Sequence, residues 1–238
     1  PITGPIVDGE SRKPPVDLPI PLVGGERTGD RTIIQQARQL MKNPNAAAVI
    51  LYIDSPGGSA IASEAMTSTL MELAKTRPVI AYMNNVAASG GYYVATPAQH
   101  IIAQPGTITG SIGVLSTKPV TAGMFDKLKV NRVTFTRGKN AGMFGTLEPF
   151  TDEQRDKSRQ IITHFYNIFV ERVATSRNMT AEQIDAVGGG RVWTGIQAHH
   201  PPTVDELGDL RTAYDKALAL TDLPEHTPLA LMTSGKGD

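Results

Sequence analysis

The sequence predicts an α/β fold in which parallel strands alternate with helices. Two apolar runs, 48–53 and 79–83, have the pattern of buried strands, and each is followed by a glycine-containing turn and a helical pattern. Short apolar strands separated by amphipathic helices are typical of βαβ units around a parallel sheet. Because 238 residues suffice for one large domain with a buried core, we expect residues 1–238 to form a single domain.

The first half of the chain contains the remaining elements of this alternation. A strand is predicted over 2–7, followed by a long exposed loop over 11–29 that is rich in proline and glycine. A helix is predicted to begin near Asp30, where apolar residues recur at helical spacing. A second helix is predicted from about Ser59 to Lys75, between the two buried strands.

The second half changes to a mainly helical pattern, and we expect a helical C-terminal part over 151–221. Two threonines are each followed three residues later by glutamine, at 151–154 and 180–183. Such capping boxes mark helix starts. A last helix is predicted over 209–220, and residues 222–238 are expected to form a fraying tail.

Composition excludes several classes of function. Lys plus Arg and Asp plus Glu both total 23, so no basic surface for nucleic acid is predicted. The absence of cysteine excludes disulfides, thiol catalysis and thiolate metal sites. His199-His200 lacks a nearby carboxylate pattern for zinc, and we predict no metal and no cofactor. No segment approaches the roughly eighteen apolar residues of a membrane-spanning helix.

The candidate site lies in two turns, Asp-Ser-Pro-Gly-Gly at 54–58 and Ala-Ala-Ser-Gly-Gly at 87–91. A strand, a small-residue turn and a helix can present a hydroxyl nucleophile beside free backbone N–H groups. Ser89 is the candidate nucleophile, and the N–H groups of Gly58 and Gly90 are candidate oxyanion donors. The alternative is that Ser89 caps a helix and Gly58 is an ordinary turn glycine. Together the turns indicate acyl-transfer chemistry.

These motifs resemble the signature blocks of the signal peptide peptidase A (protease IV) family. The resemblance extends from about residue 6 to about residue 220, and its blocks are 54–59, 87–93, 107–114, 190–195 and 204–208. It implies a serine peptidase with a Ser–Lys dyad on a ClpP/crotonase-like fold. It also implies a membrane-associated homo-oligomer of the cell envelope that cleaves signal-peptide remnants and other hydrophobic peptides. Family members usually carry a membrane anchor, which we expect to be missing from this soluble chain because it opens on Pro1.

The general base is where the sequence departs from the family, which uses a lysine kept neutral by burial. That lysine follows a strand predicted over 132–136 and lies three residues after Gly138, where this chain has Ala141. One explanation is that the chain resembles the C-terminal half of double-length members, in which a partner half supplies the lysine. A second is that alanine replaces the lysine in an inactive protein. A third is that Lys139 acts as the base, although it also fits a solvated loop position.

Further residues have expected supporting roles. In the family, a serine of the third block helps to position the lysine, which makes Ser111 a candidate. An extended peptide can bind by adding a strand to a sheet edge, and Val114, Leu115 and Ser59 are the candidate contacts. Asp54 is expected to hold its turn through backbone N–H bonds rather than to act as a triad acid.

Two rival functions and one alternative base for a serine peptidase are also considered. A crotonase-type acyl-CoA enzyme would share the oxyanion hole, with Glu64 as its candidate acid. A peptide-binding domain without activity would explain Ala141. A Ser-His-Asp triad would need a histidine such as His100, but all five histidines are expected to be structural or solvated.

Overall fold

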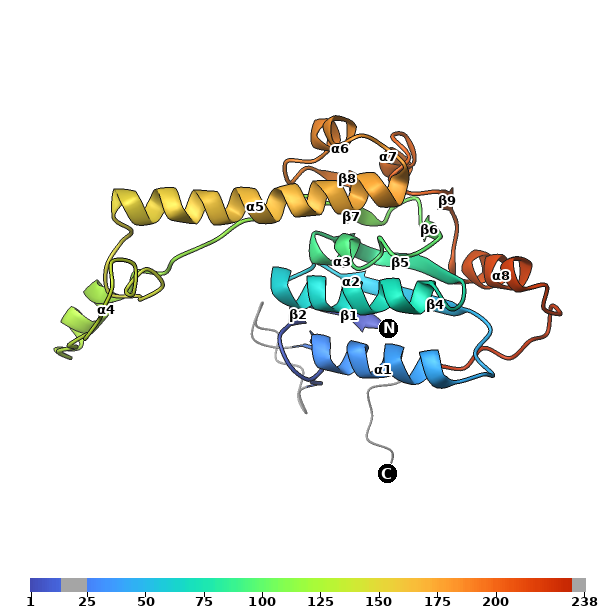
Figure 1. Cartoon of the computed structure of the whole chain (residues 1–238), viewed down its shortest axis with the longest axis horizontal. Helices are drawn as coiled ribbons and strands as arrows, with labels where there is room; N and C mark the ends of the chain where they lie inside the picture. The colour runs from blue at the N-terminus through green and yellow to red at the C-terminus, as the bar shows by residue number, and fades with distance from the viewer. Residues whose placement is uncertain (14–24, 233–238) are drawn as a thin grey trace, which may run out of the picture. The chain divides into compact units, whose positions relative to one another are not determined.

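The structure is a computed structural model that describes residues 1–13 and 25–232. Seven strands form the main sheet: β1 (Ile2–Thr3), β4 (Val49–Ser55), β5 (Val79–Ala88), β6 (His100–Ala103), β7 (Ile108–Gly110), β8 (Val192–Thr194) and β9 (Glu206–Leu207). Their order is β1–β4–β5–β6–β9, with β7 paired to β5 and β8 paired to β7 (Figure 1). Apart from the antiparallel β7–β8 pair, the described pairs of this sheet are parallel. The predicted α/β class and ClpP/crotonase-like architecture are confirmed.

The described residues divide into two compact units. Unit 1 comprises Pro1–Gly113 and Ile168–Asp238, and unit 2 comprises Val114–Asn167. All strands lie in unit 1 among the described residues. The predicted site at the two glycine-containing turns therefore belongs to unit 1.

Helices cover the sheet in the order that the sequence predicts. α1 (Asp30–Lys42) and α2 (Ala60–Ala74) match the two predicted helices and lie side by side (Figure 1). On β5, Ile80 and Tyr82 pack with Ala213 of α8 (Leu210–Thr221). Their strand neighbours point to the other face and are also buried. Both faces of the central strand are thus covered, as parallel sheets require.

The N-terminal strand predicted over 2–7 is divided in two. β1 is followed by Gly4, whose positive φ of 65° turns the chain, and by β2 (Ile6–Val7), which pairs with β3 (Thr28–Gly29) in a second sheet. The Gly4 N–H donates to the Asp54 carbonyl at 2.9 Å. Of the loop predicted over 11–29, residues 14–24 lie outside the described residues, and its end forms β3.

Two of the C-terminal helices begin at the predicted caps, and one begins at a cap that was not predicted. α5 (Asp152–Arg177) follows the Thr151 capping box, in which the Gln154 N–H donates to Thr151 Oγ1 at 3.2 Å. α6 (Ala181–Val187) and α7 (Gly195–His199) also start at capping boxes. Residues 222–232 of the predicted tail have no helix or strand. The Tyr214 hydroxyl lies 2.8 Å from the Glu225 carbonyl oxygen and 2.7 Å from that of Thr227.

Unit 2 has little core of its own. It contains α4 (Ala122–Lys127) and the first part of α5. Among its described residues, Met143 is the one buried apolar side chain. The strand predicted over 132–136 does not form, because unit 2 offers it no partner strand in the part of the chain that the structure describes. Large apolar side chains are exposed instead: Leu115, Val120, Met124, Leu128, Val130, Val133, Phe135, Phe144 and Ile161. Among the described residues, none of the helices combines the length and the hydropathy that a membrane-spanning helix needs.

Candidate active site

Ser89 occupies a sharp corner between β5 and α3 (Gly90–Tyr93). Its φ of 53° and ψ of −122° lie in a region that costs a non-glycine residue about 1–3 kcal/mol. The Ser89 N–H donates to the Gly110 carbonyl at 3.0 Å, and the Ser89 carbonyl accepts from the Tyr93 N–H at 2.9 Å. The side chain makes no cap hydrogen bond to α3. The helix-cap alternative is therefore wrong for the Ser89 hydroxyl, which stays available at a half-buried position.

Hydrogen bonding on both sides of β5 fixes this corner. Ala87 is in register with Ser55 of β4 and with Thr109 of β7, and Ala88 is in register with Gly110. The buried Thr109 hydroxyl donates to the Ala87 carbonyl at 2.8 Å. The strand is thus paired until the residue before Ser89.

The Gly57-Gly58 turn lies directly against the Ser89 corner. A Cβ on Gly57 would lie 2.5 Å from Gly90 N and 3.0 Å from Ser89 Cβ, and a Cβ on Gly58 would lie 2.1 Å from the Ile6 carbonyl oxygen. Side chains there would collide with backbone, so both positions need glycine. A Cβ on Gly90 would lie 3.3 Å from Gly58 N. The turn and the corner are therefore in contact.

The Gly58 N–H is free to bind a ligand oxygen. The residues on either side are engaged, because the Gly57 carbonyl accepts from Ile6 N–H and the Ser59 N–H donates to the Ile6 carbonyl, both at 2.9 Å. Among the described residues, the Gly58 N–H has no backbone acceptor. A hydroxyl and an unused N–H beside it form the arrangement on which acyl transfer depends.

Residues 71–223 match peptidase family S49. They make up more than half of the chain and include Ser89, whereas Gly57 and Gly58 precede them. The chain belongs to peptidase family S49.

Curated relatives of this S49 chain include proteases from plants, bacteria and archaea. A chloroplastic serine protease SPPA of Arabidopsis thaliana is 38% identical over 201 residues, covering 84% of this chain and 30% of the relative. A Protease 4 of Haemophilus influenzae is 34% identical over 229 residues, covering 95% of this chain and 35% of the relative. A putative protease of Methanocaldococcus jannaschii is 33% identical over 193 residues, covering 81% and 62% respectively. The chain thus spans about a third of the length of the first two relatives.

Two other predicted site residues of the S49 chain lie near the corner. Ser111 follows Gly110, the acceptor of the Ser89 N–H, and has a positive φ of 49°. Its own N–H donates to the Arg191 carbonyl at 2.7 Å. Ser59 is the N-cap of α2, where it accepts from the Ala62 N–H.

The remaining predicted residues belong to unit 2 of the S49 chain. Val114 and Leu115 are its first residues, and Leu115 is 83% exposed. The Lys139 side chain is 76% exposed and forms an ion pair with Glu153 at 2.7 Å. Ala141 is exposed in the adjoining turn, where its N–H donates to the Gly138 carbonyl.

The rival acids and bases have partners elsewhere. Asp54 accepts from the side-chain amides of Asn84 and Asn85 and from the Val86 N–H, so it braces the neighbouring strand more than its own turn. His100 pairs with Glu206 at 2.8 Å. No group of three potential metal ligands occurs within residues 1–13 and 25–232.

Sequence reasoning missed the residues that support the corner from α2. Ser63 Oγ would lie 2.5 Å from a Cβ on Gly90 and donates to the Ser59 carbonyl at 2.9 Å. Glu64, the acid considered for an acyl-CoA enzyme, accepts a short hydrogen bond from the Tyr93 hydroxyl. The four-residue spacing of Ser59 and Ser63 was a usable signal, because it places two small polar residues on one helix face.

Tyr93 predicts how stability changes at high pH. Burial and the hydrogen bond to Glu64 raise the pKa of Tyr93 from 10.0 to about 12. The unfolded state therefore releases this proton first, so the free energy of unfolding should fall as pH rises from 10 to 12. Urea unfolding at pH 9 and pH 11 should show a smaller loss in Tyr93→Phe than in the wild type. Equal losses in both proteins would contradict the assignment.

Proposed function

We propose that this chain is the catalytic part of a serine endopeptidase in which the Ser89 hydroxyl attacks the peptide carbonyl. The Gly58 N–H, with the Gly90 N–H beside it, would bind the oxygen that becomes negatively charged. The observation that carries the proposal is the unengaged Ser89 hydroxyl, held at a strained corner against the turn that contains the free Gly58 N–H. Membership of a peptidase family supports the same reaction.

A neutral amine is proposed to accept the Ser89 proton. To act as the base, Lys139 would have to leave Glu153 and become buried enough to lose its charge. A lysine that a partner half already holds in a buried position would not have to break the ion pair with Glu153. We therefore favour a base supplied from outside this chain, with Ser111 helping to position it.

The exposed apolar residues of unit 2 support an oligomer or a partner half. Val133 and Phe135 alternate along the segment that was predicted as a strand, and the two residues are 77% and 92% exposed. Large apolar side chains grouped on a surface mark interaction sites. A second chain that pairs with this segment would complete the strand and cover them.

The proposed substrates are hydrophobic peptides, including signal-peptide remnants, at a membrane-associated location in the cell envelope. Val114, Leu115 and Ser59 are the proposed contacts of an extended peptide. Leu115 leaves its side chain open to solvent, as a subsite for apolar residues requires. The proteases among the relatives support peptides as the substrate class.

A fluorophosphonate probe tests the proposal in the full-length protein. The probe should form one covalent adduct, which peptide mapping should place on Ser89, and Ser89→Ala should abolish it. Coenzyme A binding without labelling would favour the acyl-CoA enzyme instead. Peptide binding without labelling or cleavage would favour an inactive binding domain, the alternative that Ala141 supports. If only the base is missing, Ala141→Lys should create or increase activity.

A further inference from the structure

The helix that follows Ser89 is too short to be stable without tertiary contacts. α3 has four residues, and a single turn is unstable without tertiary contacts. Its last residue, Tyr93, is held on several sides. The Tyr93 ring packs edge-on against Phe169 of α5 at 4.8 Å between centroids, and its carbonyl accepts from Thr96 Oγ1 at 2.7 Å. The geometry of Ser89 therefore depends on what fixes Tyr93.

The Tyr93 hydroxyl is connected to α5 through Glu64. Glu64 Oε2 accepts a hydrogen bond from the Tyr93 hydroxyl, and Glu64 Oε1 accepts from Arg172 Nη2 at 2.8 Å and from Ser68 Oγ at 3.0 Å. Glu64 also follows Ser63, the residue whose Oγ contacts the Gly90 position. One carboxylate thus joins α2, α3 and α5 beside the corner.

The interactions of Arg172 contribute little to the stability of the folded protein. Its ion pair with Glu64 is partly solvated, with side-chain exposures of 26% and 37%, and such pairs contribute little to folding. The Arg172 Nε–H is buried without a hydrogen-bond partner among the described residues, which costs free energy. An apolar side chain of similar size would remove that cost, and the partly solvated Glu64 carboxylate would keep its hydrogen bonds from Tyr93 and Ser68, so stability should change little. The guanidinium therefore orients the Glu64 carboxylate and contributes little to stability.

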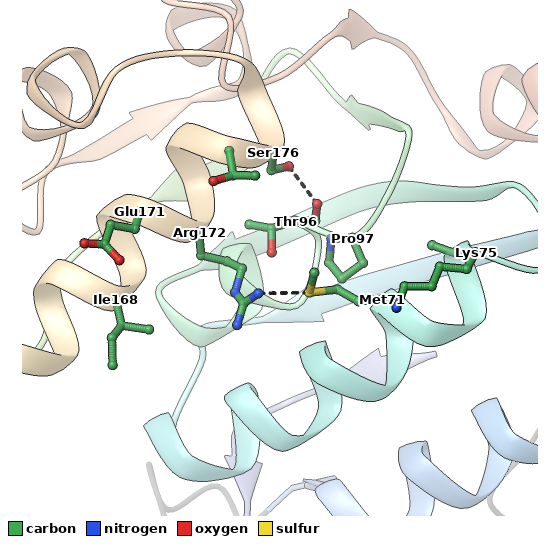
Figure 2. Close-up of a pocket in the computed structure, with 10 residues that line it drawn as sticks. Met71, Lys75, Thr96, Pro97, Ile168, Glu171, Arg172 and Ser176 are labelled. Atoms are coloured by element: carbon green, nitrogen blue, oxygen red, sulfur yellow. Dashed lines mark hydrogen bonds between the residues drawn. The ribbon is translucent and has the colours of Figure 1, made fainter.

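Arg172 can be reached from solvent. It lines a cavity of about 530 Å³ between α2 and α5, together with Met71, Thr96 and Ser176 (Figure 2). Figure 2 shows its guanidinium beside Met71 Sδ, at 3.0 Å from Nη1. A small cation that enters this cavity can take the place of a deleted Arg172 side chain.

We propose that Arg172 is a positioning residue which, through Glu64 and Tyr93, holds the Ser89 corner in its reactive geometry. The inference rests on the proposed peptidase function, because it assigns Arg172 to the same nucleophile. It adds a connection that the glycine-containing motifs do not reveal. Arg172 lies on the part of α5 that belongs to unit 1, like the other members of this connection.

The Arg172→Met variant tests whether Arg172 affects the position of Ser89 separately from the stability of the fold. In the full-length enzyme, kcat should fall about tenfold or more, as expected when a reacting group is misplaced, with KM within about twofold. The midpoint of thermal unfolding should change by no more than about 2–4 °C, because the pair is partly solvated. Tyr93→Phe should have a similar effect, and the double variant should be no worse than the more impaired single variant. Lys75→Met is the matched control, because it removes another cation from the same cavity and should retain full activity.

Chemical rescue provides the decisive readout. Ethylguanidinium added to Arg172→Ala should restore at least part of kcat in a saturable manner, and Arg172→Met, whose side chain fills the space, should not respond. Unchanged kcat in Arg172→Met, or loss of kcat only in proportion to unfolding, would overturn the inference. Failure of the proposed function is distinguishable, because the wild type would then not be labelled at Ser89 by a fluorophosphonate.

Discussion

Replacement of Ser89 by alanine is expected to reduce peptide hydrolysis at least about a thousandfold, because no other group can form the acyl intermediate. The corner should keep its shape, since the Ser89 hydroxyl makes no cap hydrogen bond and its backbone bonds to Gly110 and Tyr93 do not involve the side chain. Initial rates on an apolar fluorogenic peptide, with circular dichroism as the folding check, measure both effects. Normal turnover by Ser89→Ala would refute the nucleophile.

Ser89→Gly is the companion variant that tests the strain. It lacks the hydroxyl as well and should be equally inactive. Glycine should relieve about 1–3 kcal/mol of backbone strain, against about 0.4–1 kcal/mol of added entropy in the unfolded chain. Ser89→Gly should therefore be more stable than Ser89→Ala by about 1 kcal/mol in urea unfolding. The reverse order would mean that the corner is not strained.

Gly57→Ala is expected to have the second largest effect, because it combines strain with collision. Gly57 has a φ of 91°, and a Cβ there would lie 2.5 Å from Gly90 N and 2.8 Å from the Ala88 carbonyl oxygen. Neither backbone atom can move without shifting Ser89. We expect a loss of about 3 kcal/mol or more of stability. In the fraction that folds, we expect a fall in kcat of about a hundredfold.

Gly9→Ala is the control for Gly57→Ala. Gly9 has a similar φ of 101°, but a Cβ there would have nothing within 4 Å. Gly9→Ala should therefore introduce backbone strain without a collision. We expect a loss of about 1–2 kcal/mol of stability and an unchanged kcat. Equal effects of the two substitutions on kcat would contradict the close contact between the glycine turn and the Ser89 corner.

Local sequence patterns predicted those parts of the fold that local interactions determine. The capping boxes at Thr151 and Thr180 marked the starts of α5 and α6 correctly, because a cap involves residues three apart. The strand predicted over 132–136 failed, since an isolated strand is not stable and depends on a partner that local sequence does not reveal. The strand predicted over 2–7 was divided because Gly4 turns the chain where it meets Asp54.

The same distinction applies to the candidate site. The small residues around Ser89 predicted a sharp corner, and those around Gly58 predicted a close approach of the backbone to a ligand. The structure brings the Ser89 corner and the Gly57-Gly58 turn into contact. The Tyr93–Glu64–Arg172 connection was missed because its members lie 29 and 108 residues apart in sequence. No period or motif links such positions. The source of the base stays a prediction.

The central position of β5 has a consequence for hydrogen exchange and for thermal inactivation. β5 is paired on one side with β4 and on the other with β6 and then β7, so its amide protons should exchange with solvent only when the whole sheet opens. Ser89 is attached to the end of that strand. Partial opening at the C-terminal end would leave the nucleophile in place, and loss of activity on heating would coincide with global melting unless the pairing of Ile6 with the glycine turn opens first.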